Sequence, residues 1–243
     1  MFDEVTLLPM TSRSVRAKVE AFLADNGLRP APPDCYAAIL DDDERIVAGG
    51  GLDGDVIKCV AVSERARSGG CTNKLISFLV NLAVQRGYPA VKVFTKPSNE
   101  AVFVSLGFTL LASAPAAVLL ESGHRGLAGY KKYLSGLRRP GRNGVIVMNA
   151  NPFTLGHRYL VEQAARRVDN LYVIAVKEDR SRFPYAERKA MITEGCAPFG
   201  NVTVCEGSDY VISDATFPTY FLKKQEDASA TQMALDLDLF ATH

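Results

Sequence analysis

The segment between residues 144 and 168 constrains the fold of this chain more than any other. Residues 144–150, GVIVMNA, form an almost uninterrupted apolar run, which is typical of a strand that is covered on both faces of its sheet. The run passes through the turn NPFTLGH into residues 156–168, where apolar residues recur at helical spacing. A buried strand that leads directly into an amphipathic helix predicts an α/β fold with a parallel sheet and right-handed crossovers.

The same alternation continues to the end of the chain. We expect further strands at residues 171–176 and 202–206, and helices at residues 185–194 and 216–224. Residues 144–243 are therefore predicted to form a Rossmann-like α/β domain. Its parallel sheet has only about three strands and is expected to be incomplete, with an unpaired edge.

The first half of the chain has a different pattern and predicts an α+β domain over residues 1–135. Residues 136–143 are basic and contain glycine and proline, so we interpret them as a linker. Strands are expected at residues 4–8, 36–40, 46–52, 56–62 and 90–95, with one or two more between 108 and about 120. Helices are expected at residues 12–26, 73–85 and 99–105.

Composition narrows the class of protein. The net charge is +1, which argues against nucleic-acid or membrane-surface binding driven by overall charge. No stretch approaches the roughly 18 apolar residues of a membrane span, and the N-terminus lacks the basic region of a signal peptide. The five cysteines are scattered without a CxxC pair, which favours free thiols in a reducing cytosol over a zinc site. We expect a cytoplasmic protein without protein metal ligands.

The turn NPFTLGH is the first candidate site. Ligands of open α/β sheets bind at the carboxyl ends of the strands, where this turn begins. Thr154 and His157 are three residues apart at a helix start, so both side chains can face an anion held by the free N–H groups there. Gly156 lets a ligand approach the backbone closely. The alternative is a threonine cap beside an exposed histidine without a ligand, and the motif alone leaves both open. Four further residues of the strand end and turn complete the predicted site: Asn149, Asn151, Pro152 and Phe153.

The order of strand, Asn-Pro turn, TxGH and helix resembles the nucleotidyltransferase superfamily with its [HT]-x-G-H signature. Residues 181–188, SRFPYAER, resemble the loop and helix start that follow the second strand in such enzymes. The resemblance implies that Thr154 and His157 act on the phosphates of ATP, with Lys177 and Arg188 reaching them as well. The competing interpretation of these two cations is a solvated strand end and a helix-surface arginine.

Longer stretches narrow the resemblance. GVIVMNANPFTLGHRYLVEQAA, FPYAERKAMITEG and NVTVCEGSDYVISDATFPTYFLK are similar to the family of [citrate (pro-3S)-lyase] ligases, and the similarity extends over essentially the whole chain. The family implies an acid–thiol ligase that uses ATP, Mg²⁺ and acetate to acetylate the prosthetic-group thiol on the acyl carrier subunit of citrate lyase, with release of AMP and pyrophosphate. Family members continue past residue 243, and a second phosphate-binding element of the Ile-Ser-x-x-Arg type is not found after Ile212. We therefore expect a truncated chain with weak or absent ligase activity.

Residues 60–75 of the first domain resemble motif A of the GCN5-related N-acetyltransferases (GNAT), [QR]-x-x-G-x-[GA]. Arg65 fits the first position and Gly70 the last, whereas Ser68 replaces the first glycine. Asn99 and the later Gly-Phe pair resemble further GNAT elements, which implies a site for acetyl-CoA or CoA. Phe103 stands where many members carry a tyrosine acid, and phenylalanine cannot donate a proton. We therefore favour a structural or regulatory GNAT-like domain over one that transfers acetyl groups, and binding of acetyl-CoA or CoA stays an open alternative.

Two other functions remain open at this point. One is an adenylyl- or cytidylyltransferase that acts on another small substrate and shares the TxGH turn. The other is a non-catalytic regulatory protein that binds acetyl-CoA through its first domain.

Overall fold

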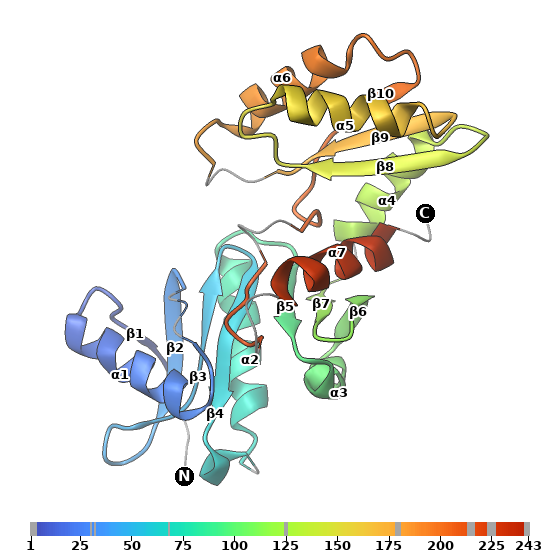
Figure 1. Cartoon of the computed structure of the whole chain (residues 1–243). Helices are drawn as coiled ribbons and strands as arrows, with labels where there is room; N and C mark the ends of the chain where they lie inside the picture. Colours follow the sequence, from blue (N-terminus) through green and yellow to red (C-terminus); the bar gives the residue numbers. More distant parts are fainter. Residues whose placement is uncertain are drawn as a thin grey trace. The chain divides into compact units, whose positions relative to one another are not determined.

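The computed structural model describes residues 4–29, 31, 33–67, 69–123, 126–177, 181–212, 217–222 and 227–240 (Figure 1). The chain divides into two compact units. The first contains Met1–Gly126 and Pro218–Leu239, and the second contains Leu127–Phe217 and Phe240–His243. These units differ from the predicted domains in two places, because residues 127–135 fall with the second unit and Pro218–Leu239 fall with the first.

The first unit is built on a mixed sheet, which confirms the α+β prediction. Its described strands are β1 (Val5–Leu8), β2 (Cys35–Leu40), β3 (Ile46–Asp53), β4 (Val56–Val62), β5 (Val91–Thr95), β6 (Phe108–Ser113) and β7 (Val118–Ser122). Their order is β1-β2-β3-β4-β5-β7-β6, and only β4 and β5 run parallel among these described neighbours. The parallel pairing is short, because it joins Val56 to Lys92 and Ile57 to Val93 and goes no further along β4.

Among the described residues before Gly126, three helices and two short 3₁₀ turns accompany this sheet. They are α1 (Arg13–Asp25), η1 (Glu64–Ala66), α2 (Cys71–Gln85), η2 (Pro97–Asn99) and α3 (Glu100–Ser105). Leu75 and Leu79 of α2 are fully buried against Leu52 and Ile57 of the sheet, together with Phe103 of α3. A second buried cluster of the first unit contains Ile39, Val47 and Ala48.

The last part of the chain returns to the first unit. Phe217–Leu222 and helix α7 (Asp227–Phe240) follow the second unit in sequence, yet Pro218–Leu239 belong to the first. Three backbone carbonyls of this segment, those of Thr219, Tyr220 and Leu222, accept hydrogen bonds from Arg29. Asp238 of α7 accepts a hydrogen bond of 2.8 Å from the backbone N–H of Ser113 on β6.

The predicted helix at residues 216–224 is wrong for its described part, since residues 217–222 form bends and turns. Tyr220, Phe221 and Leu222 are buried in succession, which a helix with one apolar face cannot achieve. Arg29 also takes the carbonyls that a helix would use internally. Residues 216, 223 and 224 lie outside the described residues.

Tyr220 connects this returning segment to strand β4 of the first unit. Its hydroxyl accepts a hydrogen bond from the backbone of Cys59 on β4, beyond the point where β4 pairs with β5. The hydroxyl of Tyr36 donates to the Cys59 carbonyl at 3.4 Å. Burial raises the pKa of both tyrosines, so neither is ionised at neutral pH. At Cys59, beyond the pairing of β4 with β5, the backbone is therefore hydrogen-bonded by the chain's own tyrosines.

The second unit has a parallel sheet, which confirms the α/β prediction. Its described strands are β8 (Asn143–Met148), β9 (Asn170–Ala175) and β10 (Val202–Cys205), in the order β10-β9-β8. Its helices, within the same limits, are α4 (Gly126–Leu137), α5 (Leu155–Ala165) and α6 (Tyr185–Cys196). The core lies between α5, α6 and the sheet, around Val161, Val173 and Ile192. Val145 of β8 is 54% exposed, against the expectation of a fully covered strand, because β8 is an edge of the described sheet.

The predicted linker at residues 136–143 is shorter in the structure. Helix α4 extends to Leu137 and β8 begins at Asn143, so residues 138–142 alone lack a helix or strand. Within the described ranges, no helix is long and apolar enough to cross a membrane.

Candidate functional site

The NPFTLGH turn joins β8 to α5, as the sequence predicts. Thr154 is the N-cap residue of α5 and His157 lies at its third position. The backbone N–H of Thr154 donates to Nδ1 of His157 at 3.0 Å, and the Thr154 hydroxyl lies 2.8 Å from the same nitrogen. The two residues form a capping box, which satisfies backbone groups that a helix start leaves without partners.

This capping geometry fixes the tautomer of His157. A ring nitrogen that accepts a backbone N–H bond carries no proton, so the proton of the neutral ring is on Nε2. The ring is half-exposed and stacks on Phe153 with centroids 5.6 Å apart. The motif therefore caps the helix and also presents Nε2–H as a donor beside the positive end of the α5 dipole. The two alternatives from the sequence, a cap and a ligand donor, are compatible in one arrangement.

The space in front of the helix start is open. A Cβ atom added at Gly156 would meet, among the described residues, only the Thr154 hydroxyl oxygen at 3.6 Å. Ala150, just before the turn, is buried and has a φ of 46°, a strained value for a residue other than glycine. The following Asn151–Pro152 peptide bond is cis.

Phe153 supports the turn from below. Its ring packs against Gly195 of α6 so closely that a Cβ atom at Gly195 would lie 2.3 Å from Cε1 of the ring. His157 stacks on the same ring, so Phe153 contacts both α6 and the histidine and helps to hold the histidine in place.

Asn149 and Asn151 fasten the turn to the loop that follows residue 180. The side-chain amide of Asn149 donates to the Ser181 hydroxyl at 3.1 Å. Asn151 Oδ1 accepts the backbone N–H of Phe183, also at 3.1 Å. Both predicted site residues thus lie at the carboxyl end of β8, and both side chains hold a neighbouring loop.

Arg188 differs from both interpretations made from the sequence. It is fully buried in α6, so it is neither a surface arginine nor an extended arm. Its guanidinium donates to the carbonyls of Asn149 and Val176 at 3.0 and 2.9 Å, and to that of Phe183 at 2.9 Å. A planar guanidinium can hold several acceptors at fixed angles. Arg188 therefore ties together the ends of β8 and β9 and the loop between β9 and α6.

Lys177 lies just beyond β9 and remains accessible, with its side chain 51% exposed and Nζ 3.9 Å from Asp209 Oδ1. Gly207 lets the segment after β10 approach closely, because a Cβ atom there would lie 2.0 Å from the Ala175 carbonyl oxygen and 3.1 Å from Lys177. The carboxyl ends of β9 and β10 thus bring one cation and one carboxylate together.

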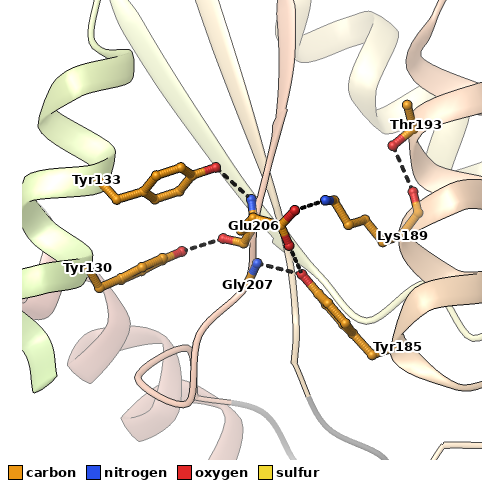
Figure 2. A network of polar contacts seen from close by, with 7 residues as sticks. All are labelled: Tyr130, Tyr133, Tyr185, Lys189, Thr193, Glu206 and Gly207. Carbon is orange, nitrogen blue, oxygen red and sulfur yellow. Dashed lines mark hydrogen bonds and ion pairs between the residues drawn. The ribbon is translucent and has the colours of Figure 1, made fainter.

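A polar network that the sequence analysis missed holds this segment (Figure 2). Glu206 accepts a hydrogen bond from the Tyr185 hydroxyl at 2.9 Å and pairs with Lys189. The backbone of Glu206 is held from α4, since its carbonyl accepts from Tyr130 and its N–H donates to the Tyr133 hydroxyl, both at 2.9 Å. The N–H of Gly207 donates to the Tyr185 hydroxyl at 2.7 Å.

Part of this network could have been found from the sequence. Tyr185 and Lys189 are four residues apart on α6 and share one helix face, as their spacing indicates. The contribution of α4 could not be seen, because three glycines weaken its helical signal.

Two of the cysteines, Cys59 and Cys205, are poorly suited to act as nucleophiles. All five are free thiols. Burial raises the pKa of Cys59 and of Cys205 to about 11, so both are protonated at neutral pH. Where the structure describes the chain, no group of three or more His, Cys, Asp and Glu residues could hold a metal ion.

The GNAT-type residues of the first unit lie at two places. Arg65 pairs with Asp41 at 2.5 Å, and Gly70 is the N-cap residue of α2 with a φ of 70°. Asn99 donates to the Thr95 hydroxyl at 2.9 Å, at the end of β5. Phe103 is buried and packs edge-on against Phe108. Ser68 lies outside the described residues.

Comparison with known proteins identifies the family. The family described as the citrate lyase ligase C-terminal domain matches residues 143–243. The chain is 40% identical over 240 residues to the [citrate [pro-3S]-lyase] ligase of Escherichia coli K12, and the match covers 98% of this chain and 68% of that protein. The chain belongs to the citrate lyase ligase family. The ligase of Haemophilus influenzae Rd is 42% identical over 236 residues, covering 96% of this chain and 70% of its own length.

Solved structures give a more distant likeness. A GNAT-family acetyltransferase from Staphylococcus aureus Mu50 covers 49% of this chain and 98% of its own, with 11% identity and a TM-score of 0.41. Escherichia coli ElaA covers the same shares with 16% identity and a TM-score of 0.40. Identities and TM-scores this low do not assign a ligand to this member of the citrate lyase ligase family.

Proposed function

We propose that this protein acetylates the prosthetic-group thiol on the acyl carrier subunit of citrate lyase, using ATP and acetate. In the first step a carboxylate oxygen of acetate bonds to the α-phosphorus of ATP and the bond to pyrophosphate breaks. In the second step the carrier thiol attacks the carbonyl of the acetyl-adenylate, AMP leaves and the thiol loses its proton. Family membership at 40–42% identity is the main support.

The observation that carries the mechanism is the hydrogen bond from the Thr154 N–H to Nδ1 of His157. It leaves Nε2–H as a fixed donor at the start of α5, where free backbone N–H groups also point outward. Acetate is ionised at neutral pH and needs no base to attack phosphorus. The site must hold the phosphates in line with acetate and stabilise the charge that develops on them, which fixed donors do well.

ATP and Mg²⁺ fit the residues present. The α5 start, His157 Nε2–H and the exposed ammonium of Lys177 are donors and cations suited to the phosphates. Mg²⁺ commonly binds through substrate phosphates and water with few protein ligands, so it neutralises phosphate charge without a dedicated cage. Arg188 is assigned a positioning role, because its buried guanidinium holds the strand ends that carry Asn149 and Lys177. The chain's buried Cys59 and Cys205 thiols are protonated, which agrees with an acceptor thiol on the partner.

Acetate-dependent exchange of pyrophosphate into ATP tests the first step without the carrier subunit. His157→Ala is expected to reduce exchange about a hundredfold, the usual effect of removing one donor to a transition-state anion. Gln163→Ala on the same helix is the matched control and should retain exchange. Equal exchange by wild type and His157→Ala contradicts the site. The same pair is also compared for ATP binding by calorimetry, which reports on the site without turnover.

The acceptor is tested separately. If acetate can be omitted and another small phosphate or nucleotide acceptor supports pyrophosphate release, the protein is an adenylyl- or cytidylyltransferase instead. Binding of acetyl-CoA without any binding of ATP favours the regulatory alternative.

A further inference from the structure

Five exposed arginines gather at the end of the second unit's sheet that is opposite the TxGH turn. Three precede β8 and two follow α5; we call them the arginine edge, and they are Arg138, Arg139, Arg142, Arg166 and Arg167. The chain as a whole has a net charge of only +1, so a basic composition does not account for this concentration.

Backbone contacts bring the two groups of arginines together. The N–H of Arg142 donates to Asp169 Oδ2 at 2.6 Å, and the N–H groups of Asp169 and Asn170 donate to the Arg142 carbonyl at 2.9 and 3.2 Å. Arg142 Nη1 also reaches the Arg167 carbonyl at 3.4 Å. Residues 138–142 and 166–170 therefore form one continuous surface within the second unit.

Local structure explains only part of this charge. Arg166 and Arg167 lie at the carboxyl end of α5, where cations are favoured by the helix dipole, and Arg166 pairs with Glu162. Asp169 is held by the Arg142 backbone. The side chains of Arg139 and Arg167 have no hydrogen-bond or ion-pair partner among the described residues. The edge therefore keeps exposed guanidinium groups that the fold itself does not use.

We propose that the arginine edge is the docking surface for an acidic face of the acyl carrier subunit; this rests on the proposed function. Guanidinium groups bind carboxylates through two parallel hydrogen bonds, and exposed clusters of one sign steer an oppositely charged protein into contact. A compact phosphate ligand fits less well, because the N–H groups of Arg139, Arg142, Asp169 and Asn170 already have acceptors.

The location also matches the chemistry. Strand β8 has six residues and separates the arginine edge from the TxGH turn by about 20 Å at roughly 3.3 Å per residue. A partner docked at this edge must therefore deliver its thiol on a long arm, which a prosthetic group provides. Docking and phosphate chemistry are then separate, and changes at the edge should leave the first step untouched.

The test is the double variant Arg139→Glu/Arg167→Glu, which removes no side-chain hydrogen bond or ion pair described in the structure. Arg86→Glu is the matched control, since Arg86 is an exposed arginine at the end of α2 in the first unit. Binding of purified acyl carrier subunit is measured by calorimetry at low and high salt, and acetate-dependent pyrophosphate exchange is measured in parallel. The double variant should bind the carrier about tenfold or more weakly, with a smaller salt dependence, and should retain exchange.

Three results would overturn the docking proposal. The wild type fails to bind the carrier, or the double variant binds it as well as Arg86→Glu does, or the edge binds DNA or inorganic polyphosphate and not the carrier. If the wild-type protein shows no acetate-dependent exchange, the proposed function is refuted instead. Carrier binding needs no turnover, so it still decides the role of the arginine edge.

Discussion

Gly195→Ala should disturb the TxGH turn from a position on another helix. Two effects oppose each other. Alanine is better than glycine within a helix by about 0.5–1 kcal/mol. The added Cβ would, however, lie 2.3 Å from the Phe153 ring, and overpacking a core of this kind costs about 1–3 kcal/mol. The clash wins, and we expect a net destabilisation of about 1–2 kcal/mol.

Gly129→Ala provides the matched control. Gly129 is also helical, in α4, but it is exposed, and a Cβ atom added there would have nothing within 4 Å among the described residues. The same substitution there should stabilise the protein by about 0.5–1 kcal/mol. Thermal unfolding followed by circular dichroism should therefore shift in opposite directions, by about 2–4 °C for each kcal/mol in a chain of this size.

The two variants should also differ in activity. Phe153 stacks on His157, so a ring displaced by about an ångström moves Nε2 and should lower acetate-dependent pyrophosphate exchange by roughly ten- to a hundredfold. Gly129→Ala should leave exchange unchanged. If Gly195→Ala is stabilised like the control and exchanges at the wild-type rate, then Phe153 does not support the histidine and the reasoning is refuted.

Three further changes test other parts of the structure. Tyr185→Phe should lower the free energy of unfolding in urea by about 1–3 kcal/mol, because the Gly207 N–H loses its acceptor. The control Tyr159→Phe, on the exposed face of α5, should change it by almost nothing, and equal urea midpoints for the two variants would contradict the network. Arg188→Met should destabilise by about 2–4 kcal/mol, since three carbonyls lose a shared donor, and a loss below about 0.5 kcal/mol would exclude the clamp. The pKa of Asp41 is lowered, first by the backbone N–H of Arg45 and then by Arg65, so the ionised carboxylate stabilises the folded protein fully above the usual aspartate pKa and loses this effect as the pH falls through the lower folded value. The difference in unfolding free energy between wild type and Asp41→Asn should therefore shrink below about pH 4, and a constant difference down to about pH 2 would refute this.

The sequence predicted those elements whose signals are local. Strands with regular alternation or continuous apolar runs, such as β4 and β8, lie within a residue or two of their expected bounds. The TxGH turn was also found from its neighbours, since a buried strand and an amphipathic helix frame it. Its capping bond between Thr154 and His157 follows from a spacing of three residues.

What could not be predicted depends on distant parts of the chain. Arg188 looks like a helix-surface arginine until three carbonyls from other segments surround it. Helix α4 contains glycine at three of its twelve positions, and it is stabilised instead by the contacts of Tyr130 and Tyr133 with Glu206, more than 70 residues away. Residues 217–222 look helical in isolation, but Arg29 holds their carbonyls. Tertiary contacts of this kind override local preference.

The return of Pro218–Leu239 to the first unit affects the order in which the protein can mature on the ribosome. All strands of the second unit's described sheet lie on one uninterrupted stretch of chain, so this unit has its sheet as soon as residues 143–205 have emerged. The first unit begins earlier, but the contact of its Cys59 with Tyr220 can form only after residues 127–217 of the second unit have been made. Residues 1–126 are thus made first but lack Pro218–Leu239 until the strands of the second unit have been synthesised, and in that interval the apolar surface that this segment covers is prone to non-native contacts.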